Sequence, residues 1–149
     1  MGDFDFYVGI WDVANRRRVD CLDPTSPWEE FPAVSMAARH FDGGANIDEI
    51  SFPTKGWAGL TVRLHDPVTD LWSLYWVSRA APVITTPVTG RFVDGRGEFT
   101  SDEEWHGVPV RVRFLWTDIS ETTARWEQAF SRDGGTTWLP NWVMESTKR

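Results

Sequence analysis

The order of hydrophobic and polar residues along the chain is typical of β-strands. Segments in which apolar and polar residues alternate recur about every 10 to 14 positions, and no long stretch has the period of an amphipathic helix. This pattern predicts an all-β domain, an antiparallel barrel or sandwich. The ten strands we expect are residues 10–19, 28–40, 45–52, 57–65, 72–78, 89–93, 97–105, 110–119, 124–131 and 138–147.

Turn residues separate these segments. Pro67 follows Asp66 at the second position of a predicted type I turn, and Asp94-Gly95 is a strong hairpin signal. Residues 80–87 are apolar but interrupted by proline, so we expect a loop over the mouth of a barrel. Residues 131–138 fit the Ser-x-Asp-x-Gly-x-x-Trp turn of sialidase propellers, but a propeller would need repeats of it and the sequence has none.

The last three predicted strands divide into an apolar and a polar face, and we assign the aromatic face to the interior. Gln128 is the polar exception on that face, so its amide needs a partner in the protein, in water or in a ligand. The apolar face carries Val110, Val112, Phe114, Trp116, Trp126, Gln128, Phe130, Trp138, Trp142 and Met144; the opposite face carries Arg111, Arg113, Thr117, Arg125, Glu127, Asn141 and Glu145.

The middle strands leave two arrangements open. In the one we favour, the interior is lined by Ala58, Leu60, Val62, Leu64, Trp72, Leu74 and Trp76. The opposite face then carries Asn46, Asp48, Trp57, Thr61, Arg63, Ser73 and Tyr75. A one-residue bulge would exchange the two sets.

Composition narrows the functional classes. With 22 acidic against 15 basic residues, the formal charge of −7 argues against binding to nucleic acid or an anionic membrane. Cys21 is the single cysteine and is interpreted as a free structural thiol, and no apolar run is long enough to span a membrane. We expect a cytoplasmic, bacterial protein.

The chain is rich in aromatic residues. Ten tryptophans and nine phenylalanines are more than the core of a domain of this size ordinarily needs, which favours an aromatic-lined pocket or an aromatic core.

The first residues carry the first family signal. A short aromatic run, read as a helical turn, leads into Gly9-x-Trp11 at the head of the first strand. This motif resembles the opening of the lipocalins and of the wider calycin superfamily. The resemblance implies that Trp11 closes the barrel floor and that a basic residue near the end of the last strand packs across it. Lys148 and Arg149 are the matching candidates.

Further segments extend the resemblance over nearly the whole chain. They are Gly43-Gly44-Ala45-Asn46-Ile47-Asp48-Glu49, residues 66–76, Arg113-Phe114-Leu115-Trp116, residues 125–131, and Asp133-Gly134-Gly135-Thr136-Thr137-Trp138 with Asn141-Trp142-Val143-Met144. Together they resemble a family of uncharacterised bacterial lipocalin-like proteins. The length of the chain predicts one domain, residues 1–149. With the ten alternating segments, the resemblance implies an antiparallel up-and-down β-barrel of about ten strands, and it carries over no reaction. This chain has Leu139-Pro140 where many relatives place an acidic residue after the tryptophan.

Motifs for metal binding or nucleophilic catalysis are missing from the sequence, and we expect no metal and no cofactor. The three histidines are interpreted as exposed residues at strand ends or turns. Arg16-Arg17-Arg18 and Asp102-Glu103-Glu104 are interpreted as solvated charges. Asp48, Arg63 and Tyr75 are the candidate catalytic residues, because an Arg beside a carboxylate and a phenol could hold a ligand and move a proton; an outward salt bridge is the alternative.

Three functions remain open. The first is binding of a small hydrophobic, aromatic or polycyclic ligand among Trp76, Trp116, Trp126 and Trp142, oriented by Gln128. The second is a cofactor-free cyclase, isomerase or lyase acting on a biosynthetic intermediate in the same cavity. The third is a packed barrel without a cavity that serves as a partner module or forms a homodimer.

Overall fold

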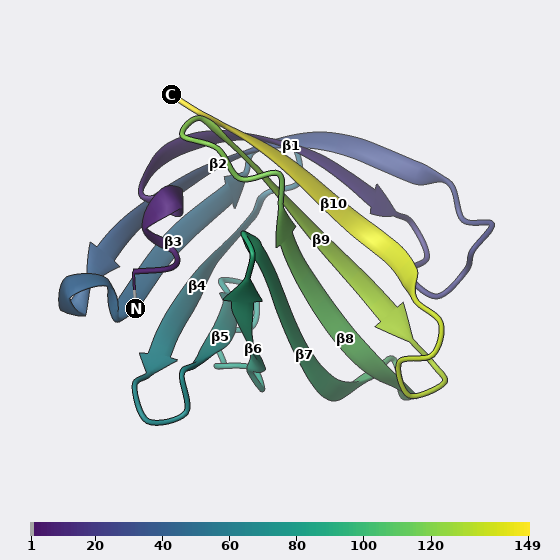
Figure 1. The fold of residues 1–149 in the computed structure, drawn as a ribbon. Helices are drawn as coiled ribbons and strands as arrows, with labels where there is room; N and C mark the ends of the chain where they lie inside the picture. The colour runs from purple at the N-terminus through teal and green to yellow at the C-terminus, as the bar shows by residue number, and fades with distance from the viewer. Residues whose placement is uncertain (1) are drawn as a thin grey trace.

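A computed structural model describes residues 2–149 as a closed antiparallel β-barrel (Figure 1). Each of the ten strands pairs with its neighbours in sequence, and the first pairs with the last. The all-β, up-and-down barrel expected from the alternating segments is therefore confirmed. The strands are β1 (Gly9–Arg18), β2 (Trp28–His40), β3 (Ala45–Phe52), β4 (Trp57–Asp66), β5 (Leu71–Ser78), β6 (Val88–Val93), β7 (Arg96–Trp105), β8 (Val108–Thr117), β9 (Thr123–Ser131) and β10 (Leu139–Lys148).

The up-and-down order gives the barrel two different ends. Two short 3₁₀ turns, η1 (Asp5–Tyr7) and η2 (Phe41–Gly43), lie at the same end as the turns after β4, β6 and β8 (Figure 1). The other end carries the connections after β1, β3, β5, β7 and β9. The predicted N-terminal helical turn is η1, and its aromatic side chains close the first end.

Trp11 forms the floor of the barrel, as the lipocalin resemblance implied. Its side chain is fully buried, and the Tyr7 ring stacks on it with centroids 4.8 Å apart. Of the two basic candidates, Lys148 lies across the indole, with Nζ 5.1 Å from the ring centroid. Arg149 instead forms an ion pair with Asp12 on the outside. Gly9 has φ +124°, a backbone conformation that glycine adopts without the steric cost that a Cβ would bring.

Phe4 extends the floor into the barrel core. Its ring meets Trp72, Phe92 and Trp116 edge-on, at centroid distances of 4.9, 5.0 and 6.1 Å. Such T-shaped contacts place ring edges on ring faces and add to the energy of burial. The aromatic run that precedes the first strand is therefore part of the core of the closed end.

The register of the middle strands corrects the favoured assignment of faces. In the β4–β5 ladder Thr61 pairs with Trp76 and Arg63 with Leu74, so Trp72, Leu74 and Trp76 do face inward. The predicted partners from β4 do not: Leu60 and Leu64 are 41% and 39% exposed. The interior of β3 and β4 carries Asn46, Asp48, Thr61 and Arg63 instead. The prediction placed even-numbered residues of β4 on the same face as even-numbered residues of β5. In the structure, each odd-numbered residue of β4 lies opposite an even-numbered residue of β5.

Two residues of the β9–β10 region also lie on faces other than those predicted. A bulge between Pro140 and Trp142 turns Asn141 inward, where it is fully buried. Trp138 precedes β10 and packs under the guanidinium of Arg113, 4.4 Å from its ring centroid, on the outer face. The rest of the predicted aromatic face is placed correctly, because alternation is unbroken along β8 and β9.

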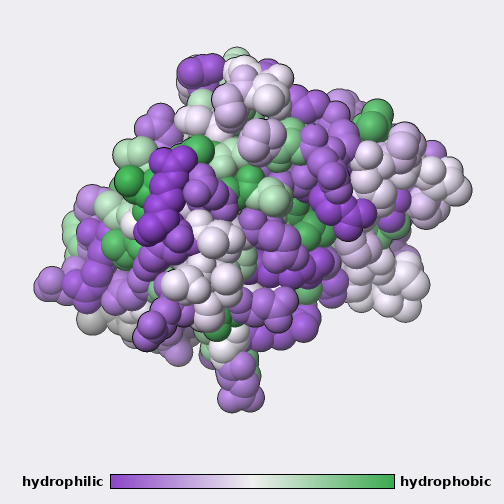
Figure 2. Space-filling model, turned by 90° about the horizontal axis from the view of Figure 1, so that it is seen from above, coloured by the Kyte–Doolittle hydropathy of each residue, from purple (hydrophilic) through white to green (hydrophobic). Residues whose placement is uncertain are grey.

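The outer surface over β1, β2 and β10 is mostly hydrophilic, with hydrophobic residues in small separate patches (Figure 2). β5 and β6 pair at only three positions, 72–74 with 88–90, and then separate. Residues 79–87 connect them across this gap. Within residues 2–149, no helix has the length and apolar character needed to cross a bilayer.

Candidate ligand-binding cavity

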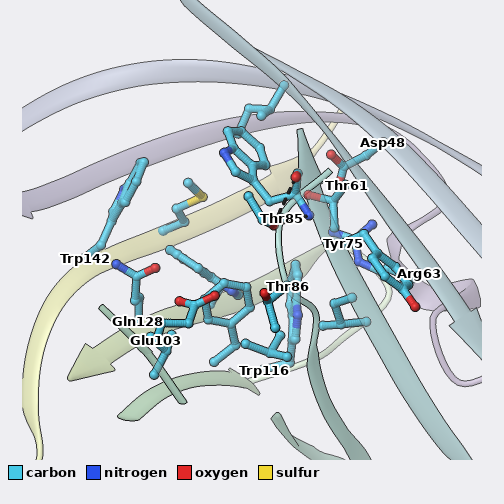
Figure 3. Close-up of a pocket in the computed structure, with 18 of the residues that line it drawn as sticks. Asp48, Thr61, Arg63, Tyr75, Thr85, Thr86, Glu103, Trp116, Gln128 and Trp142 are labelled. Atoms are coloured by element: carbon cyan, nitrogen blue, oxygen red, sulfur yellow. Dashed lines mark hydrogen bonds and ion pairs between the residues drawn. The ribbon is translucent and has the colours of Figure 1, made fainter. Parts of the chain in front are cut away.

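A cavity of about 790 Å³ fills the barrel between the floor and the open end. It is lined by Tyr7, by residues of β1 and of β3 to β10, and by residues 84–86 of the segment after β5. Asp48 and Arg63 lie on one side of the cavity and Trp142 and Gln128 on the other, with Thr85 and Thr86 between them in the view of Figure 3. The barrel is therefore hollow.

All five residues predicted to bind a ligand line this cavity: Trp76, Trp116, Trp126, Gln128 and Trp142. Trp126 is central to the aromatic wall, because its ring meets Trp142 edge-on at 5.7 Å and Phe114 edge-on at 5.0 Å. Trp76 lies on the opposite wall, where β5 has separated from β6. Flat apolar surfaces on two sides are suited to holding an aromatic molecule.

Buried amides fix the wall next to the open end. The indole Nε1 of Trp142 donates a hydrogen bond of 2.9 Å to Asn15 Oδ1. Gln128 Nε2 donates to Oδ1 of Asn141, also at 2.9 Å, and Asn141 Nδ2 donates to the carbonyl oxygen of Cys21. The partner that the sequence required for Gln128 is thus Asn141. Gln128 Oε1 receives no hydrogen bond from the described residues and remains available to a ligand.

Asp48 and Arg63 form a buried ion pair at the deep end. Arg63 Nη2 lies 2.5 Å from Asp48 Oδ2, and the two side chains are only 4% and 5% exposed. Arg63 Nη1 donates to Asn46 Oδ1 at 2.8 Å, and the guanidinium also contacts the rings of Phe4 and Tyr7. The sequence alternative of an outward salt bridge is therefore wrong.

Tyr75, the third predicted catalytic residue, is not brought to this pair. It pairs with Val62, whereas Arg63 pairs with Leu74, so alternation directs the Tyr75 side chain to the opposite face, although the residue borders the cavity. Tyr7 supplies the phenol instead. Burial raises the pKa of Tyr7, and the Asp48 carboxylate raises it further, while the Ser35 and Ser146 hydroxyls oppose the shift. The sequence feature that could have indicated a buried Tyr7 is its position in the aromatic run before Gly9.

Several polar atoms at the cavity lack a partner within the described residues. They include Asp48 Oδ1, Arg63 Nε and Arg17 Nε. Glu103 points inward from β7 beside Gln128 (Figure 3), and burial raises the pKa of its carboxyl. Sequence reasoning treated Glu103 and Arg17 as solvated members of charge runs. Alternation along β7 and β1 places both inside, and this was the signal that could have identified them.

The histidines and the cysteine lie outside this cavity. His65 corrects the expectation of an exposed residue: its side chain is 6% exposed, lies against Trp72 and has Nε2 2.8 Å from Asp70 Oδ1. His40 and His106 are exposed. Cys21 is a free, buried thiol whose pKa is raised by burial. Residues 2–149 contain no group of three or more His, Cys, Asp and Glu side chains that could hold a metal ion.

Comparisons with known proteins bear on the fold alone. No protein-family model and no curated protein matches the sequence. Among solved structures, the chain is similar to the S-type phycobiliprotein lyase from Guillardia theta, with a TM-score of 0.59 over 98% of this chain and 90% of that chain. That protein has a lipocalin-like barrel of ten strands. Sequence identity is 10%. The lipocalin-like fold is thus supported by a solved structure.

Proposed function

We propose that the protein binds a small hydrophobic molecule, aromatic or polycyclic, inside the barrel. The observation that carries the proposal is the cavity of about 790 Å³ with tryptophans on opposite walls. Ligand pockets of about 300–1,000 Å³ are usually lined by apolar and aromatic side chains with a few fixed polar groups. Gln128 and the Asp48–Arg63 pair are such groups here, because each is held by hydrogen bonds within the protein.

The pre-organisation of the cavity walls supports binding further. Trp142 is fixed by Asn15, and Trp126 is fixed by its contacts with Trp142 and Phe114. Rings that are already held in place lose little conformational entropy when a ligand enters, which favours affinity. A barrel of similar fold also occurs in the S-type phycobiliprotein lyase.

A cofactor-free lyase, isomerase or cyclase is the second candidate. It is favoured by Glu103, a cavity carboxyl whose pKa is raised by burial and which could exchange a proton with a bound substrate. In this mechanism the aromatic walls position the substrate and Glu103 acts as the general acid or base. The buried Asp48–Arg63 pair would polarise the far end of the substrate.

Tryptophan fluorescence tests the binding proposal directly. Titration with the neutral fluorophore N-phenylnaphthylamine should quench the cavity tryptophans and enhance probe emission. Trp76→Leu should weaken binding about threefold to tenfold, because it removes one aromatic wall. Trp28→Leu is the matched control, since Trp28 lies against Arg16 and Arg18 on the outer face. If neither this probe nor any member of an aromatic metabolite panel binds, the proposal fails.

Glu103→Gln separates the two candidate functions. The substitution keeps the shape of the side chain and removes its exchangeable proton. If the protein is a catalyst, turnover of a panel substrate should fall at least about a hundredfold while binding stays within a fewfold of wild type. A substrate that is converted equally well by Glu103→Gln would exclude this acid–base role.

A further inference from the structure

The arginine run on β1 contains one cation that differs from its neighbours. Arg16 faces outward, 3.7 Å from Glu30, and Arg18 Nε donates to the Pro140 carbonyl oxygen at 2.9 Å. Arg17 lies between them on the inward face and lines the cavity. It forms no hydrogen bond and no ion pair with any residue of the described chain, and its Nε is buried without a partner.

Two indole rings hold the Arg17 guanidinium. Its central carbon lies 4.9 Å from the ring centroid of Trp142 and 5.9 Å from that of Trp57. Rings stabilise a guanidinium through its faces, whereas its N–H groups point outward in the plane of the group. The donors of Arg17 are therefore oriented but unused.

The carboxylate paired with Arg17 across the β1–β2 ladder is already engaged. Glu29 is the ladder partner of Arg17 on β2, but its Oε2 lies 2.6 Å from Lys55 Nζ. The formal charge of the whole chain is −7, so an anion is attracted here only by a local cation. An unpaired, pre-oriented guanidinium at the wall of an aromatic cavity is suited to a carboxylate or sulfonate.

We propose that Arg17 binds the acidic group of the ligand, which makes the ligand an aromatic acid. This inference rests on the proposed binding function and specifies its ligand class. Trp142 joins the two parts of the site, because Arg17 lies over its ring and Trp126 meets it in a T-shaped contact. An aromatic acid bound with its carboxylate on Arg17 has its ring beside these two indoles, and Asn15 fixes Trp142 in that position.

A pair of fluorescent probes isolates the acidic group. Anilinonaphthalene sulfonate and N-phenylnaphthylamine share one aromatic skeleton, and only the first carries an anion. Wild-type protein should bind the sulfonate more tightly than the neutral probe. Arg17→Gln should weaken sulfonate binding about tenfold or more, the usual cost of losing a charge-assisted hydrogen bond, and leave the neutral probe within twofold.

Matched variants separate this site from general charge effects. Arg16→Gln removes the same charge from the outer face of the same strand and should change neither affinity. Arg17→Lys should keep part of the preference for the anion. Far-UV circular dichroism and thermal melting establish that each variant is folded; if Arg17→Gln is not, Arg17→Met, which keeps the contact with the indoles, replaces it with the same expected result.

The outcomes distinguish this inference from the function on which it rests. If the neutral probe binds but Arg17→Gln leaves sulfonate affinity unchanged, or weakens both probes equally, the anion-binding role of Arg17 is wrong and the aromatic cavity stands. If neither probe binds the wild-type protein, and the aromatic panel also fails, the binding function is wrong and the role of Arg17 falls with it.

Discussion

The shape of the cavity wall depends on glycines that leave room for a large neighbouring side chain. Gly59, beside Trp76, is the clearest case. A Cβ at this position would lie 2.1 Å from Cη2 of the Trp76 ring, so only glycine allows the indole to cover this part of β4. At Gly90, by contrast, a Cβ would lie 1.8 Å from the carbonyl oxygen of Glu98 on the neighbouring strand. A Cβ at position 59 would therefore clash with a side chain that can move, whereas a Cβ at position 90 would clash with backbone that cannot.

Substitutions at these two glycines should therefore have different effects. Gly59→Ala should displace Trp76, weaken binding of N-phenylnaphthylamine, and lower the free energy of unfolding by about 1–3 kcal/mol. Gly90→Ala should lower it more, because the β6–β7 ladder must shift. Urea denaturation and acrylamide quenching of tryptophan fluorescence measure the two effects. Unchanged Trp76 accessibility and probe affinity in Gly59→Ala would contradict this account.

The buried Asp48–Arg63 pair makes a second prediction at the scale of residues. Arg63→Ala leaves the Asp48 carboxylate buried without its partner, so we expect a loss of about 3–5 kcal/mol in the free energy of unfolding. The double variant Asp48→Leu/Arg63→Met should lose less, because no isolated charge remains. Urea denaturation of the single and double variants provides the comparison, and a double variant less stable than Arg63→Ala would contradict it.

The sequence predicts these residues unevenly. The aromatic lining of β8 and β9 could be read from alternation because no bulge interrupts it, and Trp116 and Trp126 lie where expected. Asp48 and Arg63 were correctly placed on one face but assigned to the exterior, because charges are seldom buried unless paired. Their pairing depends on Asn46 and the ring of Tyr7, contacts that local sequence does not specify.

At the scale of elements, the connection between β9 and β10 is organised by one carboxylate. Asp133 accepts hydrogen bonds from the hydroxyls of Thr137 and Ser131, at 2.6 and 2.7 Å, and from the backbone N–H groups of Thr136 and Thr137. These bonds, those from Thr137 first, hold the pKa of Asp133 well below its ordinary value. The Asp-box-like motif is thus a single turn that fixes the start of β10.

This lowered pKa predicts how stability depends on pH. Because the folded state favours the ionised carboxylate, its contribution is complete above the unfolded pKa, near pH 4, and is lost as pH falls toward the folded pKa. Asp133→Asn should therefore be less stable than wild type at pH 7, and the difference should shrink below about pH 4. Urea denaturation at a series of pH values tests this; a difference that stays constant with pH would refute it.

The elements themselves could be predicted more fully than their pairing. Ten alternating segments gave ten strands, because hydrophobic alternation is a local property of the chain. The error in β4 came from the turn to β5, where Asp66 pairs with Leu71 and leaves four residues outside the ladder. Asn141 was misplaced by the bulge before Trp142. Turn length and bulges decide which residues of two paired strands share a face. The alternation of apolar and polar residues within one strand shows neither of them.

At the scale of the whole molecule, the barrel is closed, but the ladders between its strands differ in length. The β5–β6 ladder has three paired positions, and the gap beyond it is crossed by residues 79–87. Thr85 holds this segment: its Oγ1 accepts from the backbone N–H of Trp76 and donates to the carbonyl oxygen of the same residue. We interpret the segment as the covering of the cavity mouth that the proline-interrupted sequence predicted.

Thr85→Val should loosen this covering without unfolding the barrel. The substitution keeps the shape of the side chain and removes both hydroxyl hydrogen bonds to Trp76. We expect faster hydrogen exchange in residues 79–87 and faster association and dissociation of N-phenylnaphthylamine, with equilibrium affinity changed less than either rate. Thr86→Val is the matched control, because Thr86 lines the cavity but makes no hydrogen bond to the described residues. Equal exchange rates in both variants would show that Thr85 does not hold the segment.

The pairing of β1 with β10 also has a consequence for how the chain folds during synthesis. Trp11 is the ladder partner of Lys148, so β1, which is synthesised before the other nine strands of the barrel, can form this ladder only after β10 has been made. Until then β1 has one open edge, and the indole of Trp11 lacks the lysine that lies across it. Contacts so distant in sequence form slowly. The hollow interior is therefore completed only after β10 has left the ribosome, and a ligand can enter a finished cavity only from that point on.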